Sequence, residues 1–249
     1  MKYGLCNLSV IPLRVEADDT SEMVSQVLYG ETFKVLESSK KWSHISLSYD
    51  TYEGWVDNKQ FLLISEDDFN SLEKLTLNLS SNFVDIIITS EKELFSICLG
   101  SHINVTDFLQ HNYEGSSITG SQPKSRIIET AQLYLNSPYL WGGKTPFGID
   151  CSGFTQMVYK LNGYKLLRDA SEQATQGDSL SFIEESEPGD LAFFDNEEGI
   201  ITHVGIIMQN NHIIHASGKV RIDRLDQSGI FNNDIRKHTH KLRVIKRII

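Results

Sequence analysis

The sequence is poor in cysteine and proline, with three and five residues among 249. The cysteines Cys6, Cys98 and Cys151 form an odd, scattered set. Such a set is not a disulfide framework and is typical of a reducing compartment. The fully apolar runs span only a few residues, which excludes a membrane-spanning helix, and no secretory signal is recognisable after Met1. We therefore expect a cytoplasmic protein without a membrane partner.

Basic residues are also in short supply, with 23 Lys and Arg against 33 Asp and Glu, for a net charge of -10. This balance argues against a nucleic-acid partner. Residues 122–249 carry 15 basic and 15 acidic residues, so the whole acidic excess lies in residues 1–121. Such a surface usually serves solubility. The alternative is that part of it meets a cationic group on a ligand.

The length and the 40% hydrophobic content predict a globular protein of two or three domains. Residues 9–65 contain short alternating runs, with Gly54 placed for a bulge and Trp55 for a core anchor, and they predict a small β-barrel. The acidic run at 66–68 indicates a boundary. Residues 70–120 repeat this style more weakly, as a second, divergent barrel would. We place the domains at 1–68, 69–121 and 122–249.

Residues 122–249 change character. A helix follows Pro123, and a second helix begins near Cys151 and ends at Asn162 and Gly163. The strand-like runs that follow are 191–194, 203–208, 212–216, 220–222 and 242–248. Helices followed by strands predict an α+β domain in which helices pack on an antiparallel sheet.

A cysteine at a helix N-terminus is near unpaired backbone N–H groups that stabilise its thiolate, which makes Cys151 a candidate nucleophile. His203 and His215 lie on successive strand-like runs, and a short hairpin would place them side by side as base and orienting residue. The alternatives are a buried structural cysteine and a zinc site made by these three residues. No Cys-x-x-Cys pair supports zinc, so we expect no metal and no cofactor.

Four segments in this order resemble the NlpC-type papain-like cell-wall cysteine peptidases. They are residues 150–154 (DCSGF), 188–191 (PGDL), 203–206 (HVGI) and 214–218 (IHASG). The resemblance implies a papain-like catalytic domain with Cys151 as nucleophile, His203 as general base and His215 as the third polar residue. It also implies that Tyr139 lies near the oxyanion site. Members of this family cut amide bonds next to γ-linked D-glutamate in peptidoglycan peptides.

Residues 9–65 resemble a bacterial SH3-like domain, most clearly at 52–56 (YEGWV), and residues 70–120 resemble a second copy. Two such β-barrels before the catalytic domain are similar to the γ-D-glutamyl-L-diamino acid endopeptidases that recycle muropeptides with a free N-terminal L-Ala. The resemblance assigns substrate binding to Asp150, Ser152, Arg168, Asp169, Tyr52 and Glu53. It leaves open whether Ala170 or Ser171 makes the next contact, and which diamino acid is used.

The chemistry of such a peptide agrees with this assignment. Its ammonium group needs carboxylates, for which Asp169 and Glu53 are candidates, and its α-carboxylate needs donors such as Arg168 and Ser152. The expected partner is thus a small peptide. Two alternatives remain: a secreted hydrolase that remodels intact cell wall, and an inactive module that binds wall peptides.

Overall fold

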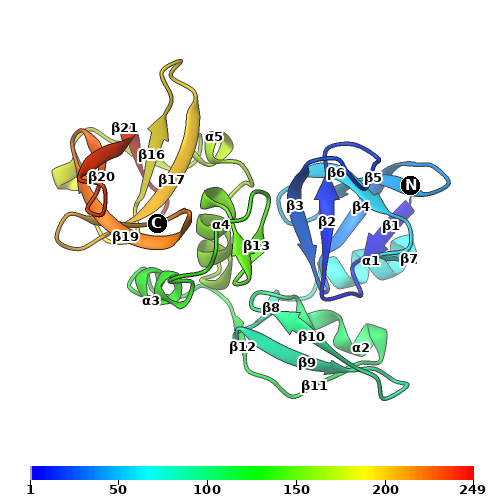
Figure 1. Cartoon of the computed structure of the whole chain (residues 1–249). Coiled ribbons are helices and arrows are strands. Elements are labelled where there is room, and N and C mark those ends of the chain that lie inside the picture. Colours follow the sequence, from blue (N-terminus) through cyan, green and yellow to red (C-terminus); the bar gives the residue numbers. More distant parts are fainter. Residues whose placement is uncertain (1) are drawn as a thin grey trace. The chain divides into compact units, whose positions relative to one another are not determined.

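The computed structural model describes residues 2–249, which divide into two compact units (Figure 1). The first unit is Met1–Gly120 with the short segment Trp141–Pro146, and Met1 itself lies outside the described residues. The second unit is Ser121–Leu140 with Phe147–Ile249. The finer division into three domains stays a prediction.

The first unit begins with a seven-stranded antiparallel sheet of order β3-β2-β6-β5-β4-β1-β7. Its strands are β1 (Lys2–Leu5), β2 (Val10–Arg14), β3 (Met23–Leu28), β4 (Thr32–Ser38), β5 (Trp42–Leu47), β6 (Glu53–Asp57) and β7 (Leu62–Ile64). Alternating residues of these strands are buried in one core that includes Ile11, Phe33, Ile45 and Val56. This period-two burial gives the N-terminal SH3-like fold predicted from the sequence.

Two expectations for strand β6 are wrong. β5 and β6 pair in unbroken register through Gly54, so there is no bulge between them. A Cβ on Gly54 would instead lie 2.7 Å from Cγ of Leu13, so glycine allows strand β2 to approach closely. Trp55 is only half-buried and lies beside His44, because the alternation points Val56 into the core.

Residues 66–119 add smaller elements to this unit. The acidic run predicted as a boundary forms the first turn of helix α1 (Glu66–Glu73), where carboxylates favour the positive end of the helix dipole. The other elements are β8 (Asn78–Ser80), β9 (Val84–Ile88), β10 (Leu94–Cys98), η1 (Ile103–Val105), α2 (Thr106–Leu109), β11 (Asn112–Tyr113) and β12 (Ser117–Thr119). The five strands form sheets of three and two, where the sequence predicted a second, divergent barrel.

The segment Trp141–Pro146, which contains β13 (Lys144–Thr145), belongs to the first unit by its contacts. Lys144 is fully buried with its ammonium 3.3 Å from a carboxylate oxygen of Glu31. Its backbone N–H donates to the side chain of Gln26 at 2.7 Å. Gly142 has a positive φ of 75°, and a Cβ there would lie 2.3 Å from the carbonyl oxygen of Met23. Only glycine therefore fits this approach to β3.

The second unit contains a closed six-stranded antiparallel barrel. Its sheet has the order β15-β21-β16-β17-β18-β19-β20, and β20 also pairs with β21 and so closes the ring. The strands are β15 (Asp178–Leu180), β16 (Leu191–Asp195), β17 (Ile201–Met208), β18 (His212–Ser217), β19 (Lys219–Asp226), β20 (Gly229–Asn232) and β21 (Lys237–Arg247). The sequence missed β15 and β20 and began the last strand at residue 242, because short or polar strands at a closing seam lack a clear apolar pattern.

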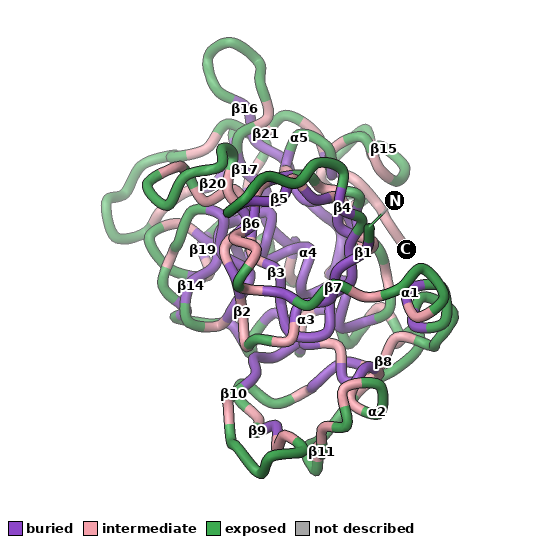
Figure 2. The backbone as a smooth tube through the Cα atoms, turned by 90° about the vertical axis from the view of Figure 1, so that its right-hand side faces the viewer, coloured by how far each residue is buried: buried purple, intermediate pink, exposed green. Residues whose placement is uncertain are grey.

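The predicted helices precede these strands, which confirms the α+β papain-like class. They are α3 (Arg126–Leu133) and α4 (Cys151–Leu161). The structure adds α5 (Ala170–Gln173), β14 (Gly148–Ile149) before α4 and η2 (Ile183–Glu185) before β16. Every residue of α4 is buried (Figure 2), and this helix packs against β17 and β18. The first turn of a buried helix is thereby held beside the strands that carry the two predicted catalytic histidines.

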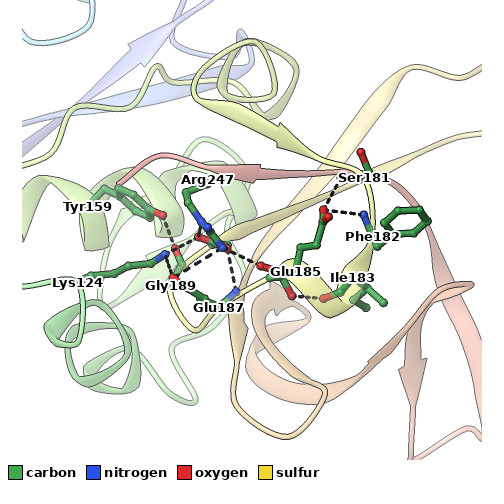
Figure 3. Close-up of polar contacts among 11 residues, drawn as sticks. Lys124, Tyr159, Ser181, Phe182, Ile183, Glu185, Glu187, Gly189 and Arg247 are labelled. Atoms are coloured by element: carbon green, nitrogen blue, oxygen red, sulfur yellow. Dashed lines mark hydrogen bonds and ion pairs between the residues drawn. The ribbon is translucent and has the colours of Figure 1, made fainter.

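A buried carboxylate joins the two ends of the second unit (Figure 3). Asp190, with no exposed surface, lies 2.7 Å from the ammonium of Lys124 and 3.1 Å from the guanidinium of Arg247. It also accepts the backbone N–H of Glu187 at 2.9 Å. The residue before it, Gly189, accepts the hydroxyl of Tyr159 from α4. One side chain thus fixes the segment before α3, the turn before β16 and the last strand.

Replacing this carboxylate is expected to destabilise the second unit. Asp190→Ala leaves two cations without their buried partner, and loss of one member of such a group costs about 3 kcal/mol. Hydrogen exchange of the β16 and β17 amides measures the change in opening free energy within this unit. The matched control is Glu187→Ala, whose exposed carboxylate contributes about 1 kcal/mol or less. Equal effects of the two substitutions would contradict the assignment.

Candidate active site

Cys151 is the first residue of α4, as the sequence predicted. Asp150 caps the helix, and its carboxylate accepts the backbone N–H of Gly153 at 2.6 Å. The cysteine side chain is 7% exposed and packs among the other residues of this buried helix. A cap of this kind defines where the helix begins and therefore where the thiol is held.

Burial and the start of helix α4 act on the pKa of the Cys151 thiol in opposite directions. Burial raises the pKa of Cys151 to about 12, and the Asp150 carboxylate adds to the rise. The backbone N–H groups of Val204 and Ser152, together with Arg168, lower the pKa but do not outweigh desolvation. The backbone N–H at the start of α4 favours the thiolate, as predicted, but burial disfavours the charged form more strongly. The resting thiol is protonated and needs a base.

His203 and His215 lie side by side on the antiparallel pair β17 and β18. Nε2 of His203 is 2.8 Å from Nδ1 of His215, and both residues are buried. The strands pair with Gly205 opposite His215, so the two histidines stand on the same face two residues apart in register. The structure thus forms the hairpin predicted from the 12-residue spacing. The roles of the two residues stay predictions.

Gly205 leaves room for this pair. A Cβ at this position would lie 2.9 Å from Cβ of His215 and 2.8 Å from Cδ1 of Ile213. Any larger residue would push strand β18 or the His215 ring away from His203. The glycine in the HVGI segment is therefore needed for the close approach of the imidazoles.

Two further residues, which the sequence analysis missed, complete the surroundings of the histidines. Asp223 on β19 accepts from Nε2 of His215 at 3.2 Å and is itself paired with Arg221. His240 on β21 stacks on His203 with ring centroids 4.2 Å apart. Asp223 could have been predicted from strand alternation. Arg221 lies opposite His215, and Asp223, two residues further along β19, points to the same face of the sheet. No local sequence pattern places His240 beside His203, because β21 reaches this position only through the strand pairing that closes the barrel.

The imidazoles are held neutral. Burial lowers the pKa of His203 well below its ordinary value, and the neighbouring His215 and His240 add to the effect. Burial also lowers the pKa of His215, although the hydrogen bond to Asp223 opposes it. Burial, followed by His215, lowers the pKa of His240 to about 4. A neutral imidazole such as that of His203 is suited to act as a general base toward a protonated thiol.

Arg168 is held inside the second unit rather than at its surface. The side chain is 1% exposed, and its two terminal nitrogens lie 2.7 and 3.1 Å from the two carboxylate oxygens of Asp150. It also donates to the hydroxyl of Ser152 at 3.0 Å. The structure thus brings together three of the residues predicted to bind substrate, all next to Cys151, while their contacts with substrate stay predictions.

Tyr139 and Asp169 border the same region. Burial raises the pKa of Tyr139 to about 12, with further increases from Cys151 and Asp150, so its phenol is a hydrogen-bond donor. Asp169 caps helix α5, and its backbone N–H donates to Glu172 at 3.2 Å. Of the two alternatives for the next contact, Ala170 is buried and Ser171 is exposed. Neither residue is thereby assigned.

Tyr52 and Glu53 belong to the first unit. Tyr52 is half-buried and packs against the barrel core, while Glu53 is exposed with its carboxylate 3.9 Å from Nε2 of His44. Both stay predictions as substrate contacts.

Residues 2–249 show no group of three His, Cys, Asp or Glu side chains that could hold a metal ion. Within the same range, no helix has both the length and the apolar character needed to cross a membrane.

The state of the thiol sets the pH dependence of its reactivity. Because the pKa of Cys151 is raised to about 12, the thiolate fraction should rise about tenfold per pH unit between pH 7 and 9. The measurement is alkylation by iodoacetamide, followed by mass spectrometry of the peptide that contains Cys151. Free glutathione is the control and should approach its plateau near pH 9. A rate that is already independent of pH between 6 and 8 would indicate a thiolate–imidazolium pair instead.

Comparison with known proteins places these features in a family. Residues 136–240 match the NlpC/P60 family, and residues 13–61 match the bacterial dipeptidyl-peptidase SH3 domain. The chain is 29% identical to a γ-D-glutamyl-L-lysine dipeptidyl-peptidase of Bacillus subtilis, over 86% of this chain and 75% of the relative. It is 27% identical to a dipeptidyl-peptidase 6 of Lysinibacillus sphaericus, over 90% of this chain and 92% of the relative.

A solved structure shows the same fold. An NlpC/P60 family protein from Bacillus cereus superimposes with a TM-score of 0.79 over 99% of each chain, at 18% sequence identity. The matched ranges contain Cys151, His203 and His215 in the second unit and most of the buried barrel core in the first. The chain therefore contains an NlpC/P60 domain of papain-like fold at residues 136–240 and a bacterial SH3-like domain at residues 13–61.

Proposed function

We propose that this protein is a cysteine endopeptidase that hydrolyses the bond between γ-D-glutamate and a diamino acid in short peptidoglycan peptides with a free N-terminal L-Ala. The observation that carries this is the thiol of Cys151 at the start of a buried helix, in a unit that also holds the buried His203–His215 pair. The substrate class is supported by the names of the relatives from Bacillus subtilis and Lysinibacillus sphaericus. The diamino acid is not specified by this chain.

The proposed reaction begins with a neutral His203 and a protonated Cys151 thiol. His203 takes the thiol proton as the sulfur of Cys151 attacks the γ-carbonyl carbon, so a C–S bond forms and an oxyanion develops. Backbone N–H groups at the start of α4 and the phenol of Tyr139 are proposed donors to this oxyanion. His203 then gives the proton to the leaving amine as the C–N bond breaks. Water, deprotonated by His203, hydrolyses the thioester and restores the thiol.

The ends of the peptide would be recognised by charge. The ammonium of L-Ala needs carboxylate partners, and Asp169 of the second unit and Glu53 of the first unit are the candidates from the sequence. The α-carboxylate of D-glutamate needs donors, which we assign to Ser152 and Arg168. Asp150 holds the guanidinium of Arg168 through two contacts, so the donor group is fixed before substrate arrives. The cytoplasmic location expected from the sequence stays a prediction.

Removal of the nucleophile tests the mechanism. Cys151→Ala should lower the release of L-Ala-γ-D-Glu from L-Ala-γ-D-Glu-L-Lys or its diaminopimelate counterpart by at least about 10³-fold, because no thioester can form. Liquid chromatography with mass spectrometry quantifies the dipeptide. Cys98→Ala is the matched control and should retain turnover, since Cys98 lies in the first unit. Undiminished release by the Cys151 variant would refute the mechanism.

The same assay separates the alternative functions. A recycling enzyme should leave intact sacculi largely undigested, whereas a wall-remodelling hydrolase should release soluble peptides from them. An inactive binding module would bind the tripeptide at one equivalent without producing dipeptide.

Blocking the amine tests the proposed charge recognition. Acetylation of the N-terminal L-Ala removes the positive charge and should lower kcat/KM by about 10²-fold or more, because the carboxylates that bind the amine are left without a partner. The comparison uses free and acetylated tripeptide with the same enzyme, and with Asp169→Asn as a matched variant. Asp169→Asn should show a smaller difference in kcat/KM between the free and the acetylated tripeptide. Equal rates on both substrates with the unmodified enzyme would remove the basis for assigning Asp169 and Glu53.

A further inference from the structure

The contact between Asp223 and the histidine pair was not predicted from the sequence. Its side chain is 1% exposed and accepts from Nε2 of His215 at 3.2 Å. Arg221 on the same strand holds both carboxylate oxygens, at 2.7 Å through Nε and 3.0 Å through a terminal nitrogen. A buried carboxylate is costly unless it is paired, and Arg221 provides that pairing.

The carboxylate is ionised in these surroundings. Burial raises the pKa of Asp223, but the hydrogen bonds from His215 and Arg221 outweigh it, so the pKa lies below the ordinary value for Asp. An ionised carboxylate only accepts hydrogen bonds. The proton in the contact with His215 must therefore be on Nε2 of the imidazole.

The position of the proton on His215 determines the position of the proton on His203. A neutral His215 that carries its proton on Nε2 has an unprotonated Nδ1. That Nδ1 lies 2.8 Å from Nε2 of His203, so Nε2 of His203 must carry a proton and donate it. The only unprotonated nitrogen left on a neutral His203 is Nδ1. The direction of each hydrogen bond thus follows from the charge on Asp223.

We propose that Asp223, held by Arg221, is a positioning residue that sets the tautomers of His215 and His203 and so leaves Nδ1 of His203 as the base for the Cys151 thiol. The inference rests on the proposed cysteine-peptidase function. In the reaction, the thiol proton moves to Nδ1 of His203 as the C–S bond forms. The resulting imidazolium donates through Nε2 to His215, whose own Nε2–H donates to the carboxylate of Asp223. The same proton leaves Nδ1 for the departing amine when the C–N bond breaks.

The competing explanation is that Asp223 and Arg221 only stabilise the barrel. The two explanations differ in what they require of the imidazole protons, because an ion pair that serves folding alone does not need a particular tautomer of His203. Asp234 provides a matched comparison. It is an exposed carboxylate that binds the same guanidinium at 2.7 Å, and within residues 2–249 it makes no hydrogen bond to His203 or His215.

The first test needs no substitution and no substrate. Long-range ¹⁵N–¹H NMR spectra of the full chain with ¹⁵N-labelled histidine report which nitrogen of each ring carries the proton. At neutral pH, His203 and His215 are both expected as the Nε2–H tautomer. A predominant Nδ1–H tautomer on either ring would overturn the proposal.

The second test is Asp223→Asn, which replaces an acceptor with an amide that also donates. His215 should then populate the Nδ1–H form and impose it on His203. The expected fall in kcat is about 10²- to 10⁴-fold, with KM changed less than threefold, as for loss of the tautomer-setting carboxylate in other nucleophile–histidine–acid sites. Asp234→Asn should keep kcat within threefold. Retention of kcat by the Asp223 variant, or a loss of kcat with unchanged tautomers, would overturn the assignment.

The two tests separate this inference from the proposed function. If the unmodified enzyme does not cleave the tripeptide, the proposed substrate fails, while the NMR spectra still decide whether Asp223 sets the tautomers. If the enzyme cleaves the tripeptide and the spectra show the other tautomers, the proposed function stands and the role of Asp223 fails.

Discussion

The hydrogen bond between His203 and His215 is the contact on which the proposed chemistry of the second unit depends. It requires that two neighbouring strands carry their histidines on one face and that the residue opposite His215 has no side chain. It also requires that the strands stay in register, which the closed six-stranded barrel ensures because every strand of the ring is paired on both sides. The 2.8 Å contact between Nε2 of His203 and Nδ1 of His215 therefore depends on the strand pairing of the whole barrel.

Burial determines how this contact can work. In water, a thiol and an imidazole are partly ionised near neutral pH, whereas here the loss of solvent raises the pKa of the thiol and lowers that of the imidazole. Both groups are thus uncharged at rest, and charge separates only when the sulfur attacks. Two groups proposed to respond to this charge are already held by hydrogen bonds: the start of α4 and the chain from His215 to Asp223. Such preorganised dipoles are effective in a buried site.

Much of this arrangement could be predicted from the sequence because it depends on local patterns. The helical spacing after Cys151 and the two strand-like runs with His203 and His215 were enough to predict a nucleophile beside a histidine pair. The parts that were missed depend on contacts far apart in the chain. Strand β20 and the first half of β21 are polar and short of apolar alternation, so His240 was not placed beside His203. Trp55 was misplaced because aromatic character was given more weight than the inward direction of its neighbour Val56.

The partner of Arg168 could not be predicted from residue identity alone. In the sequence Arg168 is followed by Asp169, whereas the structure pairs its guanidinium with Asp150, which also caps α4. A buried ion pair contributes little net stability compared with apolar packing, because desolvation of both charges offsets their attraction. What the pair provides is position: the carboxylate that defines the first turn of α4 also fixes the guanidinium, which in turn binds the Ser152 hydroxyl. The start of the helix, the thiol and the donors proposed for the substrate carboxylate are therefore held by one group, and a shift of any one of them would move the others.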